Sequence, residues 1–518
     1  MKRNNSPCTI RRALLALLLP AWCFTAAAQG PVSDRYEQLL RRNPWNDGPN
    51  VAGLRCDSLS RSRALLSGGA EGGGFRDSWE AQRLWSAGAE AASVMHREHW
   101  SMVGNFAYES SEADGMCGSM LLEPGAWPLD VQEFTPGRKS FQRYAFTGGL
   151  SLDLNPRWRL GSVLDYSARN AAKRKNLRYA SARLDLDFRP GVQHILENGT
   201  VLGANLRYAR RAETVNAEQI GTAQTPPSAF FDEGAKLGNL EVWTGSGTHL
   251  SEPGVSGLPF QENLGGLSLQ AQRGRWYADL ALNTSLLRVG EKQTIWYRSP
   301  TLGLETHLFY RLPASGGAQQ TLRLNASWQR QKVLRTVLGK ESAHGITLTR
   351  EYGANRIQTR SLSALAAEYE RLGQAWDYRA GLQFGLDDVV AAPLYPWLYR
   401  RTVARIRLEG GALRRLGRWS LQAGLMLATG SVSEEEGHYP GAEVTATTAR
   451  PYRLDRKDYY ICNEFASAFR TGVSAGARRE LGHGLWAALS GRFLQAFGVQ
   501  YCEGSARYSG GLSLGYDF

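Results

Sequence analysis

The last eleven residues of the chain constrain its fold more than any other segment. They read Y-S-G-G-L-S-L-G-Y-D-F, with Tyr508, Leu512, Leu514, Tyr516 and Phe518 on one parity and small or polar residues on the other. Residues that alternate with a period of two lie on opposite faces of a β-strand. One face of this strand is therefore apolar and aromatic, which is typical of a strand between lipid and a polar lumen.

The same alternation recurs through most of the chain. It covers segments 146–154, 158–166, 180–188, 267–272, 276–282, 322–328, 378–386, 404–408 and 419–427. Short turns near residues 155, 198, 274, 373, 417 and 482 alternate with long polar segments at 109–142, 209–262, 331–356, 387–401 and 430–464. This arrangement predicts an all-β fold, a transmembrane antiparallel β-barrel with short periplasmic turns and long extracellular loops.

The strand count follows from the last strand, which should end in the periplasm. Counting back gives about seventeen strands from Trp85 onward, and an even number requires one more. Residues 64–75 can supply it, so we predict about 18 strands, with 16 as the alternative. A tryptophan follows five of the short turns, which predicts a belt at the periplasmic interface. These residues are Trp158, Trp276, Trp376, Trp419 and Trp486.

The N-terminus is typical of a secretory signal peptide. Four basic residues, Lys2, Arg3, Arg11 and Arg12, precede an apolar stretch at 13–24, and three alanines precede Gln29. We expect residues 1–28 to be the signal peptide, 29–62 a periplasmic N-terminal segment and 63–518 the barrel, in the cell outer membrane. A short amphipathic helix is expected over 34–42. The segment before the barrel is too short for the plug domain of an active transporter.

The chain carries a formal net charge of +13, and +9 remains after removal of the four basic residues of the leader. A basic surface facing anionic lipid head groups explains this charge with the fewest assumptions. The sharper interpretation is a lumen that attracts anions.

Charged residues of both signs fall on the inward parity of the predicted strands. The candidates for lumen or solute contact are Arg183, Arg323, Arg379, Arg405, Arg407, Glu409, Asp185 and Asp187. Such charges can orient a polar solute, or they can form ion-pair ladders that stiffen the wall. We favour the ladder for the set as a whole. Arg405, Arg407 and Glu409 share one strand and are the preferred functional cluster.

Four cysteines remain after the leader, and the compartment permits disulfides. Cys462 and Cys502 fall in consecutive outer loops and are the preferred pair, with two reduced thiols as the alternative. Two histidines at 96 and 99 lie in a predicted turn, so we expect no metal site and no cofactor. The aromatic segment 395–399 is interpreted as part of an interface girdle, with sugar stacking as the alternative.

Two segments resemble a known family. They are W-N-D-G-P-N-V-A-G-L at 45–54, ahead of a glycine-rich strand, and N-P-R-W-R-L-G-S-V-L-D-Y-S-A-R-N from Asn155, followed by D-F-R-P-G at 187–191. The chain resembles an uncharacterised outer-membrane barrel family of the Bacteroidota, a domain of unknown function. The resemblance implies an outer-membrane location and no known activity.

We therefore expect a passive pore or uptake channel for small polar or anionic solutes. The alternatives are a surface receptor, adhesin or scaffold anchored by the barrel, and an enzyme at the outer rim. We expect no catalytic residues, because no nucleophile or paired-carboxylate motif stands out. The expected partners are outer-membrane lipid and lipopolysaccharide, the barrel-assembly machinery through the strand ending at Phe518, and a separate transporter, but no nucleic acid.

Overall fold

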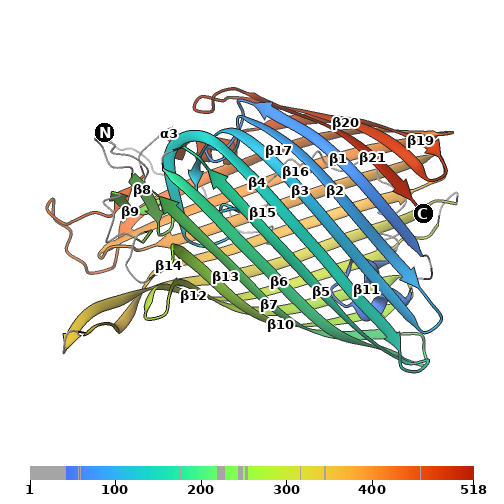
Figure 1. Cartoon of the computed structure of the whole chain (residues 1–518), viewed down its shortest axis with the longest axis horizontal. Coiled ribbons are helices and arrows are strands. Elements are labelled where there is room, and N and C mark those ends of the chain that lie inside the picture. Colours follow the sequence, from blue (N-terminus) through green and yellow to red (C-terminus); the bar gives the residue numbers. More distant parts are fainter. Residues whose placement is uncertain are drawn as a thin grey trace, which may run out of the picture.

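The computed structural model describes residues 43–56, 58, 60–175, 177–218, 228–242, 249–250, 255–314, 317–343, 346–454 and 457–518. The predicted signal peptide and the predicted helix over 34–42 lie outside these residues. Within them, eighteen long antiparallel strands surround a lumen, and most of the smaller elements lie at one end (Figure 1).

The long strands are β1 (Arg61–Gly73), β2 (Arg83–His96), β3 (Trp100–Ser119), β4 (Asp130–Asp153), β5 (Trp158–Lys173), β6 (Arg178–Ile195), β7 (Val201–Glu218), β10 (Leu258–Arg273), β11 (Trp276–Glu291), β12 (Thr294–Arg311), β13 (Gln319–Ala343), β14 (Ile346–Leu372), β15 (Trp376–Ala391), β16 (Trp397–Leu416), β17 (Trp419–His438), β19 (Arg470–Gly482), β20 (Leu485–Ala496) and β21 (Ala506–Asp517). The smaller elements are α2 (Pro44–Asp47), η1 (Val51–Cys56), β8 (Ser228–Asp232), β9 (Leu237–Val242), β18 (Tyr452–Arg453) and α3 (Lys457–Ser467).

The barrel closes between its first and last strands. Each long strand pairs with the next along the chain, and β1 pairs with both β2 and β21. The register across the closing seam places Gly69 opposite Gly511. The prediction of 18 strands is confirmed, and the segment 64–75 supplies the additional strand β1.

The outer surface is apolar. Large apolar side chains are exposed on every second residue, for example Leu421, Leu425 and Leu427 on β17, and Leu425 is 69% exposed. A closed barrel leaves no unpaired strand edge, which is what hydrocarbon requires of strands that cross it. The protein is an outer-membrane β-barrel. Among the described residues, no helix has the length and apolarity needed to cross a membrane.

Four of the five predicted belt tryptophans face outward beside the short turns. Trp158, Trp276, Trp376 and Trp419 are all exposed, which confirms the belt for them. Trp486 is 0% exposed and faces the lumen, so the prediction is wrong there. Each of the four exposed tryptophans is the first residue of its strand, whereas Trp486 is the second residue of β20 after Leu485, so strand alternation places it on the opposite face.

The segment 331–356, predicted as a loop, is instead a continuation of two strands. β13 and β14 pair as far as Ala343 and Ile346, and their hairpin extends beyond the rest of the barrel at the loop-bearing end (Figure 1). Trp397 in the predicted girdle segment is 4% exposed and packs among loop residues, with its indole N–H donating to the carbonyl of Ala449. The girdle interpretation is therefore wrong for Trp397.

The extracellular mouth is filled by loops that fold inward. β8 pairs with the outer end of β4 and with β9, and β9 pairs with β18. The core beneath this small sheet joins loop residues such as Trp127 and Phe231 to wall residues such as Phe260, Val289 and Val333. These side chains are removed from water inside the barrel, so they hold the loops in the mouth as a cap.

Candidate functional site

The N-terminal residues 43–56, here called the strap, lie against the inner wall near the periplasmic turns. Their seat is a groove made by four glycines on four successive strands: Gly149, Gly161, Gly191 and Gly203 on β4, β5, β6 and β7. A Cβ atom on Gly161 would lie 2.6 Å from the backbone nitrogen of Ala52. Because glycine lacks this atom, the strap can approach the wall closely.

Polar contacts fix the strap in this groove. The fully buried Asn50 donates from Nδ2 to the carbonyl of Val192 at 3.0 Å, and Ser151 Oγ donates to the carbonyl of Ala52 at 3.0 Å. Arg55 pairs with Asp153 and also donates to the carbonyl of Arg97 in the β2–β3 turn at 2.7 Å.

At its other end, the strap reaches the wall formed by β10 and β11. The ring of Trp45 contacts that of Tyr277 edge-on at 5.1 Å, and its indole N–H donates to Gln272. The strap therefore covers the part of the periplasmic mouth between β3 and β11.

A chamber of about 900 Å³ lies along the opposite wall, formed by β14–β17 and β19–β21. Its roof consists of the capping loops, including residues 77–80, 124–130 and 232–236. Its lining extends down to Arg379 and Gln422, each three residues from a belt tryptophan. The chamber thus spans most of the lumen between the cap and the periplasmic turns.

The chamber wall carries an excess of guanidinium groups. Among the described residues, no carboxylate lies within ion-pair distance of the lining residues Arg405, Arg470 and Arg492. The charges of Arg405 and Arg492 act on Arg470, so the three groups lie near one another. Water in the lumen screens this repulsion only in part, and the cluster therefore favours an anion.

Other arginines of the chamber are neutralised locally. Arg407 Nη2 lies 2.8 Å from Glu409 Oε2, and Arg360 Nη2 lies 2.8 Å from Asp387 Oδ2. Because these arginines are neutralised, the net positive charge of the chamber wall comes from Arg405, Arg470 and Arg492, which have no carboxylate partner among the described residues.

One acidic residue of the roof titrates near neutrality. Burial raises the pKa of Glu80, on the loop between β1 and β2, to about 7, although Arg507 Nη1 lies 3.5 Å from its carboxylate. Asp77 and Glu71, also nearby, act in the same direction as burial. The charge of the chamber therefore depends on pH in the physiological range.

Half of the residues predicted from parity lie on the chamber wall. They are Arg379, Arg405, Arg407 and Glu409. Whether they contact a solute stays a prediction. Arg470 and Arg492 share their inward parity but were missed, since strand alternation alone does not show which inward residues meet across a lumen.

The other four predicted residues form ion pairs away from the chamber. Arg183 Nε lies 3.0 Å from Asp185, and Arg183 Nη1 lies 3.3 Å from Glu123 and 3.7 Å from the fully buried Glu213. Asp187 accepts from Arg207 Nε at 2.8 Å. Arg323 lies 4.0 Å from Glu370 and covers the ring of Phe309. This arrangement agrees with the ladder interpretation for these residues.

The cysteines of the predicted disulfide are free thiols in the structure. Cys462 Sγ lies 3.1 Å from Ser78 Oγ, whereas Cys502 Sγ lies 3.7 Å from the carbonyl of Arg76, so both contact the β1–β2 loop. The predicted disulfide is therefore not formed here. His96, in the predicted turn, bonds to Ser101 Oγ at 2.8 Å, and the described residues contain no cluster suited to a metal ion.

The model of a family described as "Family of unknown function (DUF6850)" matches residues 51–518. The predicted resemblance to a family of unknown function is confirmed, and its attribution to the Bacteroidota stays a prediction. The sequence matches no curated protein.

Several solved structures share the barrel architecture at low identity. The ferric preacinetobactin receptor BauA from Acinetobacter baumannii has a TM-score of 0.40 and 10% identity, over 89% of this chain and 80% of that one. The copper transporter OprC has a TM-score of 0.40 and 8% identity, with the same coverage. OccAB2 from Acinetobacter baumannii has a TM-score of 0.31 and 8% identity, over 89% of this chain and 98% of that one. At these scores, the fold assignment rests on the strand pairing of the chain itself.

Proposed function

We propose that this chain, which belongs to the DUF6850 family of unknown function, is an outer-membrane uptake barrel that binds small anionic solutes in its chamber. The observation that carries the proposal is the cluster of Arg405, Arg470 and Arg492 on the chamber wall, without a carboxylate partner among the described residues.

Guanidinium groups suit this role because each presents a planar set of N–H donors. They bind carboxylate and phosphate groups in a bidentate manner, and their pKa keeps them charged at every relevant pH. An anion in the chamber would relieve the mutual repulsion of the three groups, which favours binding. The pairs Arg407–Glu409 and Arg360–Asp387 present fixed charges of both signs beside the cluster, and these can orient a polar solute.

The cap and the strap support gated uptake over a permanently open pore. The cap covers the extracellular mouth with a hydrophobic core, and the strap covers part of the periplasmic mouth. A solute would therefore pass only when at least the cap rearranges, in the way that lids limit access to many binding sites. A separate transporter as partner, as predicted from the sequence, fits such a gated route and stays a prediction.

Ion selectivity tests the proposal directly. The barrel is refolded, inserted into planar bilayers and placed in a KCl gradient, and the reversal potential gives the anion preference. The wild type should prefer chloride, and R405A/R492A should lose this preference. The matched control R138A/R157A removes two exposed arginines outside the chamber and should behave as the wild type.

If the barrel carries too little current for a reversal potential to be determined, direct binding provides a second test. Calorimetric titration of the folded barrel with inorganic phosphate and with citrate should detect binding that R405A/R492A weakens at least tenfold. A cation preference, or equal behaviour of the wild type and R405A/R492A in both measurements, would contradict the proposal.

A further inference from the structure

The lipid-facing surface of β11–β14 changes from apolar to basic toward its extracellular end. Leu302 and Leu304 on β12 and Trp328 on β13 are exposed on the outer face. Beyond them, the same face carries five exposed or half-exposed basic side chains. These are Arg288 on β11, Arg298 on β12, Arg330 and Lys332 on β13, and Arg356 on β14. We call these five residues the rim patch.

Strand register gathers the rim patch into one surface. Arg288 lies opposite Arg298 in the pairing of β11 with β12. The same row continues through Leu334 of β13 to Arg356 of β14. Because neighbouring strands are about 4.8 Å apart, the row spans about 14 Å. The two basic residues of β13 lie beside this row on its membrane side, so the patch is continuous.

Most of the positive charge of the rim patch is not neutralised by the protein. Arg298 is the exception, since both of its Nη atoms donate to Glu351 of the β13–β14 hairpin at 2.6 Å. Among the described residues, no carboxylate lies within ion-pair distance of the other four cations. By contrast, the exposed arginines Arg138 on β4 and Arg400 on β16 each have a carboxylate within 2.9 Å. The rim patch therefore favours an anion from outside the chain.

The depth of the rim patch indicates where that anion lies. Trp276 of the periplasmic belt and Arg288 lie on the same strand, twelve residues apart. At a rise of about 3.3 Å per residue and a tilt of about 40°, they are separated by about 30 Å along the barrel axis. The apolar band of such a barrel is about 25 Å tall. Arg288 therefore lies just beyond the hydrocarbon, at the depth of the head groups of the outer leaflet.

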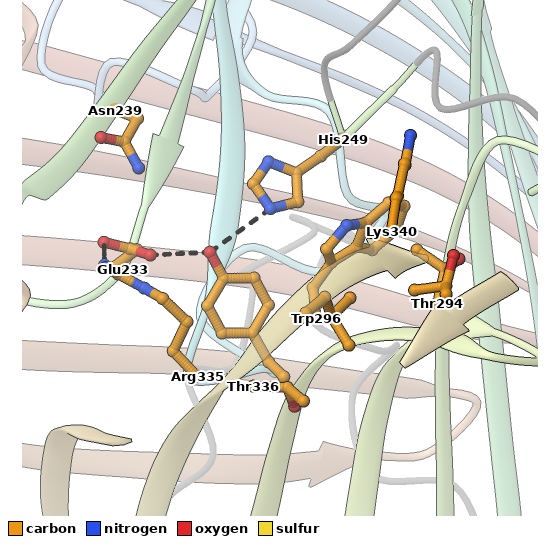
Figure 2. Close-up of a pocket in the computed structure, with 11 residues that line it drawn as sticks. Glu233, Asn239, His249, Thr294, Trp296, Arg335, Thr336 and Lys340 are labelled. Carbon is orange, nitrogen blue, oxygen red and sulfur yellow. Dashed lines mark hydrogen bonds and ion pairs between the residues drawn. The ribbon is translucent and has the colours of Figure 1, made fainter. Parts of the chain in front are cut away.

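Contacts on the inner side of β12 and β13 hold the patch in place. The Tyr297 hydroxyl donates to Glu233 Oε1 at 2.6 Å, and Arg335 pairs with the same carboxylate (Figure 2). Tyr297 directly precedes Arg298 on β12, and Arg335 opposes Tyr297 in the register with β13. The backbone that carries the outward cations is thus fixed to the cap before a lipid arrives, which lowers the entropic cost of binding.

We propose that the rim patch binds a phosphorylated glycolipid of the outer leaflet, the lipid A part of lipopolysaccharide. Guanidinium groups bind phosphate in a bidentate manner. A row of about 14 Å with unpaired arginines at both ends suits two separated phosphates on one disaccharide head group better than a single phosphate. The exposed leucines and Trp328 on the membrane side would contact the acyl chains.

This site is separate from the anion chamber. None of its five residues lines the chamber, and their side chains lie on the lipid-facing side of the wall. The inference therefore does not rest on the proposed uptake of anions. It gives the lipopolysaccharide contact expected from the sequence a defined place on the barrel.

Native mass spectrometry of the folded barrel in detergent tests the inference. The probes are bisphosphorylated lipid A and the same lipid after removal of both phosphates. The wild type should bind the bisphosphorylated form at least tenfold more tightly. R288Q/R356Q and R330Q/K332Q should each weaken its binding at least fivefold, because glutamine keeps a polar side chain and removes the charge.

Three controls separate the rim patch from other effects. R138Q/R400Q removes two exposed arginines that already have carboxylate partners, and it should bind lipid A as the wild type does. R405A/R492A should also bind lipid A as the wild type does, whether or not the chamber selects anions. Inorganic pyrophosphate carries two phosphates without acyl chains, and at equal concentration it should not displace lipid A.

Four outcomes would overturn the inference. They are equal affinity for the two lipids, binding as in the wild type by both patch variants, displacement of lipid A by equimolar pyrophosphate, and an equal loss of binding in R138Q/R400Q. The third would show a site for soluble anions, and the fourth would show attraction by total charge alone. If one patch variant does not fold, the other carries the test, since the two pairs of residues lie on different strands.

Discussion

Asn50 of the strap and Gly191 of β6 lie so close that a methyl group on Gly191 would overlap the Asn50 side-chain oxygen. The wall at this point is thus shaped for the strap. Glycine within a strand often marks a place where another backbone approaches closely, and the four groove glycines of successive strands all lie beneath the strap.

Filling the groove should displace the strap. In G161A/G191A, two methyl groups would occupy the space of Ala52 and Asn50, at an overpacking cost of roughly 1–3 kcal/mol per site. Such a cost shifts the population toward the displaced strap by about tenfold or more. Bilayer recordings should show larger or more frequent conductance steps than in the wild type.

The control for this experiment is G303A. Gly303 lies on β12, and a Cβ atom there would have its nearest contact at 3.7 Å, the carbonyl of Trp328. The G303A barrel should conduct as the wild type does. Unchanged conductance in G161A/G191A, with the strap still protected from protease, would show that the groove does not govern access.

Arg183 should contribute to stability and not to selectivity. R183M removes one of the two arginines that pair with Asp185, the other being Arg169, and leaves the buried Glu213 with one cation fewer. Breaking a buried ion pair typically costs about 3–5 kcal/mol. Urea unfolding of the lipid-embedded barrel should show this loss, while R157A, at an exposed pair, should change stability little. A lowered anion preference in R183M would instead place Arg183 on the solute route.

The anion preference should rise as the pH falls through about 7. Glu80 has its pKa raised to about 7, so below that pH its carboxyl is neutral and the chamber loses one negative charge. The reversal potential, measured from pH 8.5 to 5.5, should shift accordingly, and E80Q should keep the low-pH value throughout.

The same pKa shift has a consequence for stability. A raised folded-state pKa means that the contribution of Glu80 is fully present below the unfolded value of 4.5 and is lost as the pH rises through about 7. E80Q should therefore reduce the decrease in unfolding free energy between pH 5 and 8. Parallel pH profiles for the wild type and E80Q would contradict this account.

Trp486 and Trp419 should differ in their effects on stability although both follow short turns. Trp486 is fully buried in the lumen wall, with Arg478 stacked 4.0 Å from its ring, whereas Trp419 is exposed to the lipid interface. W486A should destabilise the barrel by about 3–5 kcal/mol, as large core truncations do. W419A should cost clearly less in the same unfolding assay. Equal losses would argue against the inward position of Trp486.

Parity predicted the barrel because each strand has one face in lipid, so apolar residues that face lipid alternate with polar residues that face the lumen. It therefore placed Arg379, Arg405, Arg407 and Glu409 on the inner wall. The belt prediction, which used only the distance from a short turn, failed at Trp486, because β20 begins one residue earlier, at Leu485. The first residue of a strand is set by the pairing with its neighbour, which the sequence near a turn does not fix.

The cap and the strap depend on contacts of loops with the barrel wall, and the ion pairs depend on contacts with loops and neighbouring strands. Strand alternation assigns a residue to the inside but does not tell which inside residues meet. Arg183 is neutralised by Glu123 from a loop, while Arg405 faces open space, and the two look alike in sequence. The glycines of the groove were visible too, but their alignment on neighbouring strands appears only once the register is known.

The seam between β1 and β21 joins the two ends of the barrel sequence, and it is poor in side chains. Gly68, Gly69, Gly510 and Gly511 lie at its centre, so backbone hydrogen bonds provide most of its cohesion. The seam also brings together residues more than 400 positions apart, which makes it a late and entropically costly contact in folding. Until β21 is in place, two strand edges remain unpaired, so a chain that loses its last strand would enter the membrane as an open, aggregation-prone sheet.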